Sequence, residues 1–390
     1  MEYEILKPPP RHRWVPWVVL VVLVVGAVGV GGYLVGVRGR PPSRAADRTG
    51  AAPAAQPTGL RPLTVRSTVP ANGATGVPSD QQVTVTFSGK VAATIGVPTF
   101  SPPVPGTWRH AGPDAVTFAA TAPFVPTTTE TLTVPAGPAG VRSTTGAVLA
   151  APVTVVFGVA QASTERLQQL LAQLDYLPVS FTPSGSAPAP AGAATAQAGT
   201  FAWRWPGLPP EFVSLWTEGA ENVITKGALM SFERQHGLQV DGVAGHQLWT
   251  ALLGDAAAGK ASSAPYVDVL VSKQVPQALT LYQDGAPVLS GIAVNTGAPG
   301  ADTADGTFPV FEHVPSSRMQ GTNPDGSTYD DPAVPWASYF NGGDALHGFV
   351  RATYGTPQSN GCVEMPVAVA AQVWPLTPVG TLVTVTGPAS

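Results

Sequence analysis

Between Trp14 and Val37 the chain carries no charged residue, and this segment limits the possible folds more than any other part of the sequence. At about 1.5 Å per helical residue it is long enough to cross a hydrocarbon layer of about 30 Å. A cleaved signal peptide is the competing interpretation, but the apolar run is too long for one and no Ala-x-Ala site follows it promptly. The sequence therefore predicts a cytoplasmic tail over 1–13 and a single transmembrane helix over 14–37. Because only the C-terminal side of this span holds domain-like sequence, we expect a plasma-membrane protein whose folded part is extracytoplasmic, on the cell wall side.

Composition separates the remaining chain into a spacer and folded domains. Residues 38–62 are rich in Pro, Ala and Arg without an apolar period, which predicts a disordered linker. Charged residues make up only 11% of the chain, against about a quarter in an ordinary domain. The net charge of −4 offers no basic surface for a nucleic-acid backbone, so we expect no nucleic-acid partner.

Residues 63–159 consist of short alternating runs. Val83, Val85 and Phe87 alternate with threonines, and turn signals separate the runs, which is typical of an antiparallel β-sandwich. The opening stretch, 67–78, resembles the bacterial Ig-like domains of cell-surface proteins.

Residues 161–255 change to a helical pattern. One predicted helix has its apolar face at positions i, i+3, i+4 and i+7, formed by Leu167, Leu170, Leu171 and Leu174. Asn222 is a plausible N-cap of a second helix. The stretch 232–245 resembles the small three-helix peptidoglycan-binding domain of wall enzymes. An Ala/Pro/Gly-rich insertion over 178–220 departs from that family.

Residues 265–387 return to a strand pattern. Apolar residues alternate from Val267 to Val271, and Asp284-Gly285 reads as the turn of a hairpin. The Pro/Gly/Asn/Asp-rich stretch 315–343 is too long for a simple connection and is interpreted as a lid. The whole chain is thus predicted to be multidomain and mainly β.

The chemistry is concentrated at the single cysteine. Cys362 lies in the run Ser359-Asn360-Gly361-Cys362-Val363, downstream of the pair His347-Gly348. One thiol cannot form an internal disulfide, so a lone Cys in an exported protein needs another explanation. A thiol attacks a carbonyl as thiolate, and a neighbouring imidazole can take its proton and hold the ion pair. The alternative is an inert buried cysteine.

The glycines beside these residues fit a nucleophile. Gly361 permits a tight turn that would aim the N–H groups of Gly361 and Cys362 at one oxyanion. Pro366 suits the first turn of a following helix, whose positive end would favour a thiolate. No His/Cys/Asp cluster has zinc spacing, so we expect no metal and no cofactor.

The run Leu346-His347-Gly348, then Gly355-Thr356-Pro357, then Ser359 to Val363 resembles the catalytic stretch of the YkuD-type L,D-transpeptidases. Thr303 to Phe308 is similar to the upstream Thr-Pro-x-Gly segment of that family. The resemblance implies a β-sandwich or barrel over 265–387. It also implies an enzyme of peptidoglycan biosynthesis, and so of cell wall organisation and cell shape. Such an enzyme cleaves a tetrapeptide donor, releases D-Ala and passes the acyl group to a diaminopimelate amine in a 3→3 cross-link. Carbapenems are implied inhibitors.

The resemblance also assigns roles position by position. It implies that Cys362 is the acylated nucleophile, that His347 is the base and that the carbonyl of Gly348 orients the imidazole. Ser359 would shape the loop, and Gly361 would serve the oxyanion. Two substrate-side positions depart from the family: Asn360 replaces a His, and Glu364 replaces an Arg or Asn.

Three functions remain open from the sequence. The first is the L,D-transpeptidase. The second is an L,D-carboxypeptidase or endopeptidase that resolves the same acyl-enzyme with water. The third is a wall-binding scaffold whose catalytic fold has decayed, with Asn360 and Glu364 as marks of decay.

Overall fold

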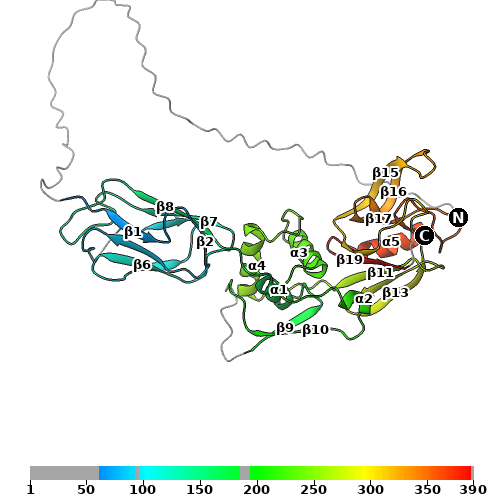
Figure 1. The fold of residues 1–390 in the computed structure, drawn as a ribbon, viewed down its shortest axis with the longest axis horizontal. Helices are drawn as coiled ribbons and strands as arrows, with labels where there is room; N and C mark the ends of the chain where they lie inside the picture. The colour runs from blue at the N-terminus through cyan, green and yellow to red at the C-terminus, as the bar shows by residue number, and fades with distance from the viewer. Residues whose placement is uncertain (1–60, 94–95, 185–193, 388–390) are drawn as a thin grey trace, which may run out of the picture. The chain divides into compact units, whose positions relative to one another are not determined.

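The computed structural model describes residues 61–93, 96–184 and 194–387, which form three successive domains (Figure 1). The fold is mainly β and multidomain, as the sequence predicts. Within the described ranges, no helix is both long and apolar enough to cross a membrane. The predicted tail 1–13, the span 14–37 and the linker up to residue 60 lie outside the described residues.

The first domain is a sandwich of two four-stranded sheets. One sheet has the order β1-β3-β6-β5, with the strands β1 (Val65–Val69), β3 (Val83–Phe87), β6 (Ala115–Ala120) and β5 (Gly106–His110). The other has the order β2-β8-β7-β4, with the strands β2 (Ala74–Val77), β8 (Val153–Val159), β7 (Thr129–Val134) and β4 (Thr99–Ser101).

The alternation in β3 shows why this segment forms a sandwich. Val83, Val85 and Phe87 are buried between the sheets, while the intervening threonines are less buried. Because successive side chains of a strand point to opposite faces, this pattern places every second residue in the core. Trp108 packs at the edge of the same core and donates a hydrogen bond to the carbonyl of Pro98 at 2.8 Å.

The second domain is helical only in part. It contains the helices α1 (Thr164–Gln173), α2 (Pro210–Val213), α3 (Val223–Gln235) and α4 (His246–Ala258), and also the strands β9 (Val179–Pro183) and β10 (Gly199–Trp203). The two strands form an antiparallel hairpin within the predicted insertion. The expected three-helix description is therefore incomplete. Val179 and Phe181 are buried and alternate with exposed residues, a period of two that favours a strand over a helix.

Two helices of this domain, α1 and α3, begin where capping side chains satisfy free amides. Ser163 accepts a hydrogen bond from the amide of Arg166 at the start of α1, and the predicted cap Asn222 accepts one from Thr225 at 2.9 Å. Near the end of α3, the buried carboxylate of Glu233 accepts hydrogen bonds from the amides of Asp241 and Gly242, at 3.0 and 2.9 Å, in the segment before α4. These two bonds fix the turn after α3.

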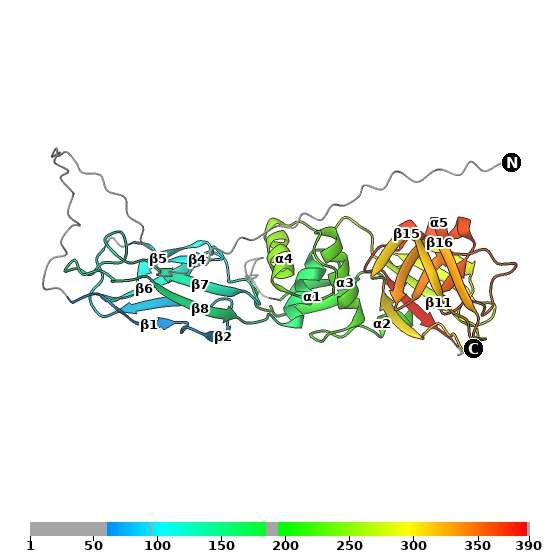
Figure 2. The same ribbon diagram turned by 90° about the horizontal axis from the view of Figure 1, so that it is seen from above.

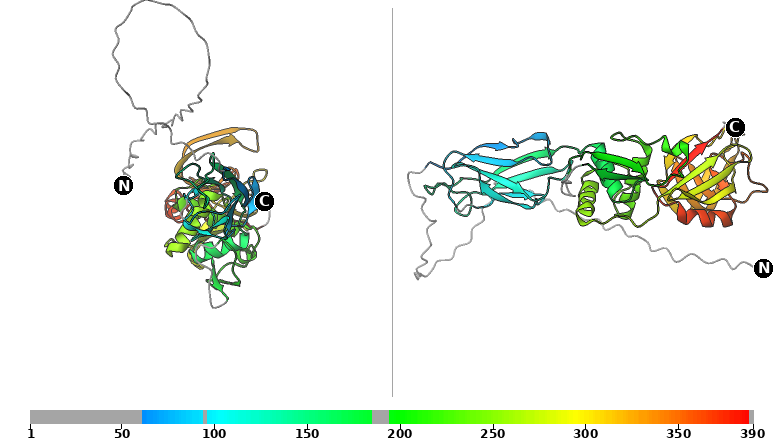
Figure 3. Two further views of the ribbon diagram at one scale, coloured as in Figure 1. Left: turned by 90° about the vertical axis from the view of Figure 1, so that its left-hand side faces the viewer. Right: turned by 90° about the horizontal axis from the view of Figure 1, so that it is seen from below.

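The third domain packs two sheets around one apolar core. The five-stranded sheet has the order β13-β12-β11-β19-β14, with the strands β13 (Ala286–Ala293), β12 (Ala278–Gln283), β11 (Val267–Ser272), β19 (Leu382–Thr386) and β14 (Gly306–Pro309). The four-stranded sheet has the order β15-β16-β17-β18, with the strands β15 (Glu312–Thr322), β16 (Thr328–Asn341), β17 (Asp344–Gly348) and β18 (Val363–Met365). Helix α5 (Val367–Val373) packs against β16 and β17 and continues into the 3-10 turn η1 (Trp374–Leu376). It is drawn in red in the right-hand view of Figure 3.

The stretch interpreted as a lid, 315–343, forms most of an extended hairpin rather than an irregular connection. β15 and β16 pair in antiparallel register from Glu312–Tyr339 to Thr322–Thr328 and lie side by side in Figure 2. The prolines and glycines of this stretch do not prevent pairing, because a register shift between Ser317 and Met319 absorbs the irregularity. The free end of this hairpin borders the cavity described next.

Candidate active site

Two short parallel strands bring Cys362 and His347 together. β17 and β18 pair with His347 opposite Glu364 and Leu346 opposite Val363. Neighbouring residues on paired strands point to the same face, and side chains alternate along each strand. His347 and Glu364 therefore share a face, and Cys362, two residues before Glu364, is directed to that face as well.

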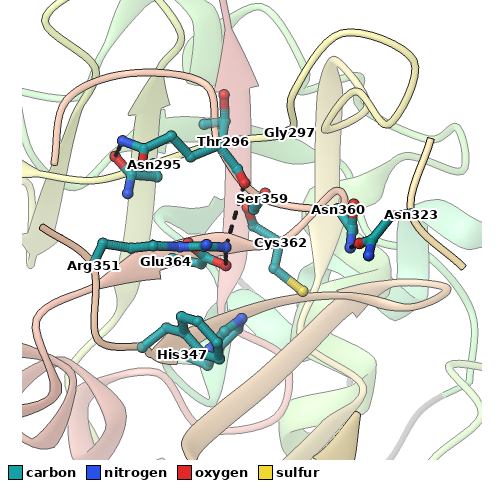
Figure 4. Close-up of polar contacts among 12 residues, drawn as sticks. Asn295, Thr296, Gly297, Asn323, His347, Arg351, Ser359, Asn360, Cys362 and Glu364 are labelled. Atoms are coloured by element: carbon teal, nitrogen blue, oxygen red, sulfur yellow. Dashed lines mark hydrogen bonds and ion pairs between the residues drawn. The ribbon is translucent and has the colours of Figure 1, made fainter. Parts of the chain in front are cut away.

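This face forms the wall of a cavity of about 470 Å³. The cavity takes residues from the β15–β16 hairpin, from β17 and from the loop before β18; they include Tyr329, Asp331, His347, Arg351, Asn360, Cys362 and Glu364. Figure 4 shows the sulfur of Cys362 directed to the side of the pocket where the imidazole of His347 lies.

The imidazole of His347 is held as a neutral base. The residue is 3% exposed, and its Nδ1 lies 3.2 Å from the carbonyl oxygen of Gly348. Since a carbonyl only accepts, this contact requires the proton on Nδ1 and leaves Nε2 of a neutral ring as a proton acceptor. Burial lowers the pKa of His347, although the Gly348 carbonyl and Glu364 oppose that effect.

The surroundings of Cys362 favour a protonated thiol. Burial raises its pKa to about 12, and the negative charges of Asp344 and Glu364 raise it as well, against the hydrogen bond from the Ala345 amide. The thiol donates to the carbonyl of Gly343 at 3.6 Å. Among the hydrogen bonds of the described residues, none joins the thiol to His347. The resting pair is thus a neutral thiol and a neutral imidazole, rather than the expected ion pair.

The expected help from the following helix is missing. Pro366 is the residue before α5, but the three residues of β18 stand between Cys362 and this helix. The field of a helix end falls off within about one turn. The N-terminus of α5 is therefore too far along the chain to stabilise a thiolate.

The loop before Cys362 is shaped by its own side chains. Gly361 has φ of +108°, and a Cβ there would clash with the carboxylate of Asp344. Ser359 is buried and donates from Oγ to the carbonyl of Cys362 at 2.5 Å. Asn360 donates to the side chain of Asn323 at 2.6 Å, so the loop contacts the end of the β15–β16 hairpin.

Segment 295–297 supports this loop from behind and escaped the sequence analysis. Asn295 is fully buried, and its side-chain oxygen accepts from the amides of Gly355 and Thr356 at 3.0 and 3.3 Å. Its backbone pairs with Glu364 in both directions at 2.9 Å. The carbonyl of Thr296 accepts from the amide of Ser359 at 3.0 Å. An Asn-Thr-Gly run after a strand carries no recognisable signal for such a role.

Glu364 has a partner that the sequence analysis also missed. Its carboxylate binds Arg351 through Nε at 2.8 Å and Nη2 at 2.7 Å. Glu364 is 4% exposed, and the guanidinium of Arg351 lies 4.7 Å from the centre of the Phe349 ring. The hydrogen bond to Glu364 raises the pKa of Arg351. The unusual acid beside the nucleophile is therefore compensated by an arginine on the segment after β17.

The remaining histidine of the domain, His313, lies outside this cavity. His313 on β15 stacks on Trp374 at 4.1 Å, and its Nε2 lies 2.9 Å from the carbonyl of Trp374. Over the described residues, no group of three or more His, Cys, Asp or Glu side chains has the arrangement of a metal site.

Comparison with family models identifies three regions of the chain. Residues 265–385 match the model of the L,D-transpeptidase catalytic domain, residues 60–159 match a bacterial Ig-like domain, and residues 219–252 match a putative peptidoglycan binding domain. These matches confirm the three domain types that the sequence predicts. A comparison with curated proteins gave no match.

Solved structures with some similarity to the chain include L,D-transpeptidases. An enzyme from Mycobacterium smegmatis is 13% identical, with 84% of this chain and 100% of that chain covered and a TM-score of 0.28. L,D-transpeptidase 3 from Mycobacterium tuberculosis, in complex with a faropenem-derived adduct, is 14% identical, with 83% and 97% covered and a TM-score of 0.29. The catalytic domain of an Enterococcus faecium L,D-transpeptidase is 24% identical, with 32% and 100% covered and a TM-score of 0.28.

The raised thiol pKa predicts the reactivity of the free protein. With the pKa of Cys362 at about 12, the thiolate fraction is minute at pH 7 and grows tenfold per pH unit. The rate of alkylation by iodoacetamide should therefore rise steadily from pH 7 to pH 10 without a plateau. Intact-mass spectrometry measures it, with glutathione as a reference thiol. A plateau below pH 8 would show a resting thiolate–imidazolium pair and contradict this electrostatic description.

The Arg351–Glu364 pair predicts a local stability effect. Arg351→Met leaves a buried carboxylate unpaired and should lower the free energy of opening of β17 and β18 by about 2–4 kcal/mol. Hydrogen exchange of peptides covering these strands, measured by mass spectrometry, reports that free energy.

Two further variants serve as controls for this prediction. Arg318→Met breaks the exposed Arg318–Asp330 pair in the same domain. It should change the free energy of opening of β17 and β18 by less than about 1 kcal/mol. Adding Glu364→Gln to Arg351→Met should restore part of the loss. If Arg351→Met lowers the free energy of opening no more than Arg318→Met does, the Arg351–Glu364 pair is not a stabilising contact.

Proposed function

We propose that the chain is an L,D-transpeptidase that forms 3→3 peptidoglycan cross-links through a thioester on Cys362. The observation that carries this proposal is the pairing of β17 with β18, which presents a cysteine and a neutral histidine to one cavity. The match of residues 265–385 to the L,D-transpeptidase catalytic domain supports the same reaction class.

The acylation step follows from the protonation states. The Sγ of Cys362 attacks the carbonyl of the bond before the terminal D-Ala of the tetrapeptide donor, while Nε2 of His347 takes the thiol proton. The carbonyl oxygen becomes an oxyanion, which backbone N–H groups of the loop before β18 stabilise. As the tetrahedral intermediate collapses, the C–N bond breaks and His347 returns the proton to the amine of D-Ala. D-Ala leaves, and the donor is held as a thioester.

Deacylation reverses the proton path with a new nucleophile. The neutral side-chain amine of a diaminopimelate acceptor attacks the thioester and loses a proton to His347. The C–S bond breaks, the new amide forms, and the proton returns to Cys362. In the acylation step, the high resting pKa of Cys362 means that little free thiolate exists beforehand. Transfer of the thiol proton to His347 is therefore concerted with attack of the sulfur on the substrate.

The charges of the cavity fit a zwitterionic peptide substrate. Asp331, Arg351 and Glu364 line it together with Cys362, so carboxylates and an arginine lie near both reacting groups. No cofactor takes part in this scheme. A carbapenem would enter it as a donor whose acyl group stays on the sulfur.

The other domains suit a position between membrane and wall. Residues 219–252 match a putative peptidoglycan binding domain, and we propose that this domain holds the enzyme on its polymer. We further propose that residues 14–37 anchor the chain in the plasma membrane, with the catalytic domain extracytoplasmic.

The reaction predicts a defined set of products. The protein should form one covalent adduct with a carbapenem, on Cys362, because the chain has a single cysteine. With disaccharide-tetrapeptide it should release D-Ala and yield a cross-linked dimer. Cys362→Ala should do neither, and His347→Gln should lose about 10²–10⁴-fold in rate. Mass spectrometry measures the covalent adduct, and chromatography measures the released D-Ala and the cross-linked dimer.

A matched histidine and the product pattern make this test decisive. His313→Gln removes a histidine of the same domain that lies outside the cavity and should leave the rate unchanged. D-Ala release with only tripeptide as product would identify a carboxypeptidase. No adduct, with an intact fold and retained binding to sacculi, would identify a scaffold.

The proposed topology predicts protease access from outside. Protease added to intact spheroplasts should remove the domains that follow residue 39, because the uncharged run 14–37 holds only the N-terminus on the cytoplasmic side. Immunoblotting with antibodies to the catalytic domain measures the loss. Full protection of the domains in intact spheroplasts, with digestion after lysis, would refute this topology.

A further inference from the structure

A buried threonine outside the Cys362–His347 pair contacts the catalytic loop. Thr303 is 1% exposed and lies just before β14. Its Oγ1 accepts a hydrogen bond from the amide of Gly297 at 2.8 Å and donates one to the carbonyl of Gly361 at 2.7 Å. The mechanism above assigns no task to this hydroxyl.

The donor and acceptor roles of the Thr303 hydroxyl follow from its two backbone partners. The amide of Gly297 only donates and the carbonyl of Gly361 only accepts. The hydroxyl proton therefore points to Gly361, and the oxygen of Thr303 receives the Gly297 proton.

The contact determines where the next amide points. In a trans peptide the carbonyl and the N–H lie on opposite sides of the bond. Since Thr303 holds the oxygen of the Gly361–Cys362 peptide, the N–H of Cys362 is turned away from Thr303. In the described turns and loops, no backbone carbonyl accepts from the amide of Cys362, so this N–H is available to a developing oxyanion.

The hydroxyl is the contact that fixes this peptide, because the backbone alone would not. Gly361 adopts φ of +108°, a region where glycine moves easily. The peptide on the other side of Cys362 is held independently by Ser359 Oγ. Without Thr303, the Gly361–Cys362 peptide would lose the contact that holds its carbonyl oxygen.

Thr303 is itself held in place. The buried ammonium of Lys273 donates to its carbonyl at 3.2 Å and pairs with Asp305 at 2.8 Å. The position of the hydroxyl is thus set by the five-stranded sheet, since Lys273 directly follows β11.

We propose that Thr303 is a positioning residue whose hydroxyl aims the Cys362 N–H at the oxyanion of the acyl-transfer intermediate. This inference rests on the proposed function and adds a specific residue to it. Its consequence is selective: acyl transfer needs the oxyanion contact, whereas alkylation of the sulfur by iodoacetamide forms no oxyanion.

The test compares these two reactions in full-length protein. Thr303→Val removes the hydroxyl and should slow acylation by imipenem between about 10-fold and 10³-fold. It should leave the rate of alkylation at pH 9 within about twofold, because the thiol is unchanged. Thr303→Ser keeps the hydroxyl and should restore acylation. Thr307→Val, which breaks the Thr307–Thr384 hydroxyl contact at 2.9 Å outside the cavity, is the matched control and should affect neither rate.

Each outcome decides the proposal. Normal acylation of Thr303→Val overturns it, and an equal loss of acylation and alkylation also overturns it, because the residue then acts on the whole loop. If the valine variant does not fold, Thr303→Ala removes the hydroxyl without the second methyl group and gives the same comparison. Wild-type protein that is alkylated but not acylated by imipenem refutes the proposed function instead. Acylation by p-nitrophenyl acetate then decides the role of Thr303.

Discussion

The catalytic arrangement depends on the parallel pairing of β17 with β18. Because His347 stands opposite Glu364, the nucleophile two residues earlier is directed to the same face as the imidazole. A shift of one residue in this register would turn one of the two side chains into the core of the domain. The register is held from outside the pair, since Asn295 bonds to the backbone of Glu364 in both directions and its side chain fixes the segment at Gly355. The position of Cys362 therefore depends on a residue that does not line the cavity.

The same burial that fixes the geometry disfavours a thiolate. Asp344 and Glu364 stand near the sulfur, and Arg351, an arginine that lines the same cavity, has two of its nitrogens engaged by Glu364. A protein with this electrostatics is not reactive toward every electrophile at neutral pH. In the proposed reaction, the proton passes to His347 while the thiol attacks a bound acyl donor, which would favour selectivity over general thiol reactivity.

Local patterns in the sequence predict single segments, whereas contacts between distant segments leave no local signal. His347, Cys362 and their glycines lie in one short stretch, and the alternation of Val83 to Phe87 is enough to predict a sandwich. Asn295, Thr303 and Arg351 act through contacts between distant segments, so their roles depend on a strand register that no local pattern specifies. The hairpin at 315–343 differs from its predicted structure for another reason. Its prolines and glycines predict an irregular connection, but the long antiparallel ladder, with one register shift, stabilises the strands against that preference.

The two departures from the family pattern bear on the idea of a decayed scaffold. A carboxylate buried beside the nucleophile without a partner would cost several kcal/mol, yet Glu364 is bound at two oxygens by Arg351. Asn360 is likewise bound, by Asn323 at the end of the hairpin. Loss of function alone gives no reason for either partner to be present, nor for Thr303 to hold the peptide that precedes the sulfur. At this site each unusual residue has a matching contact, and Nδ1 of His347 is engaged by the Gly348 carbonyl, which leaves Nε2 for the proton transfer that we propose. These contacts favour the proposed reaction over a decayed scaffold.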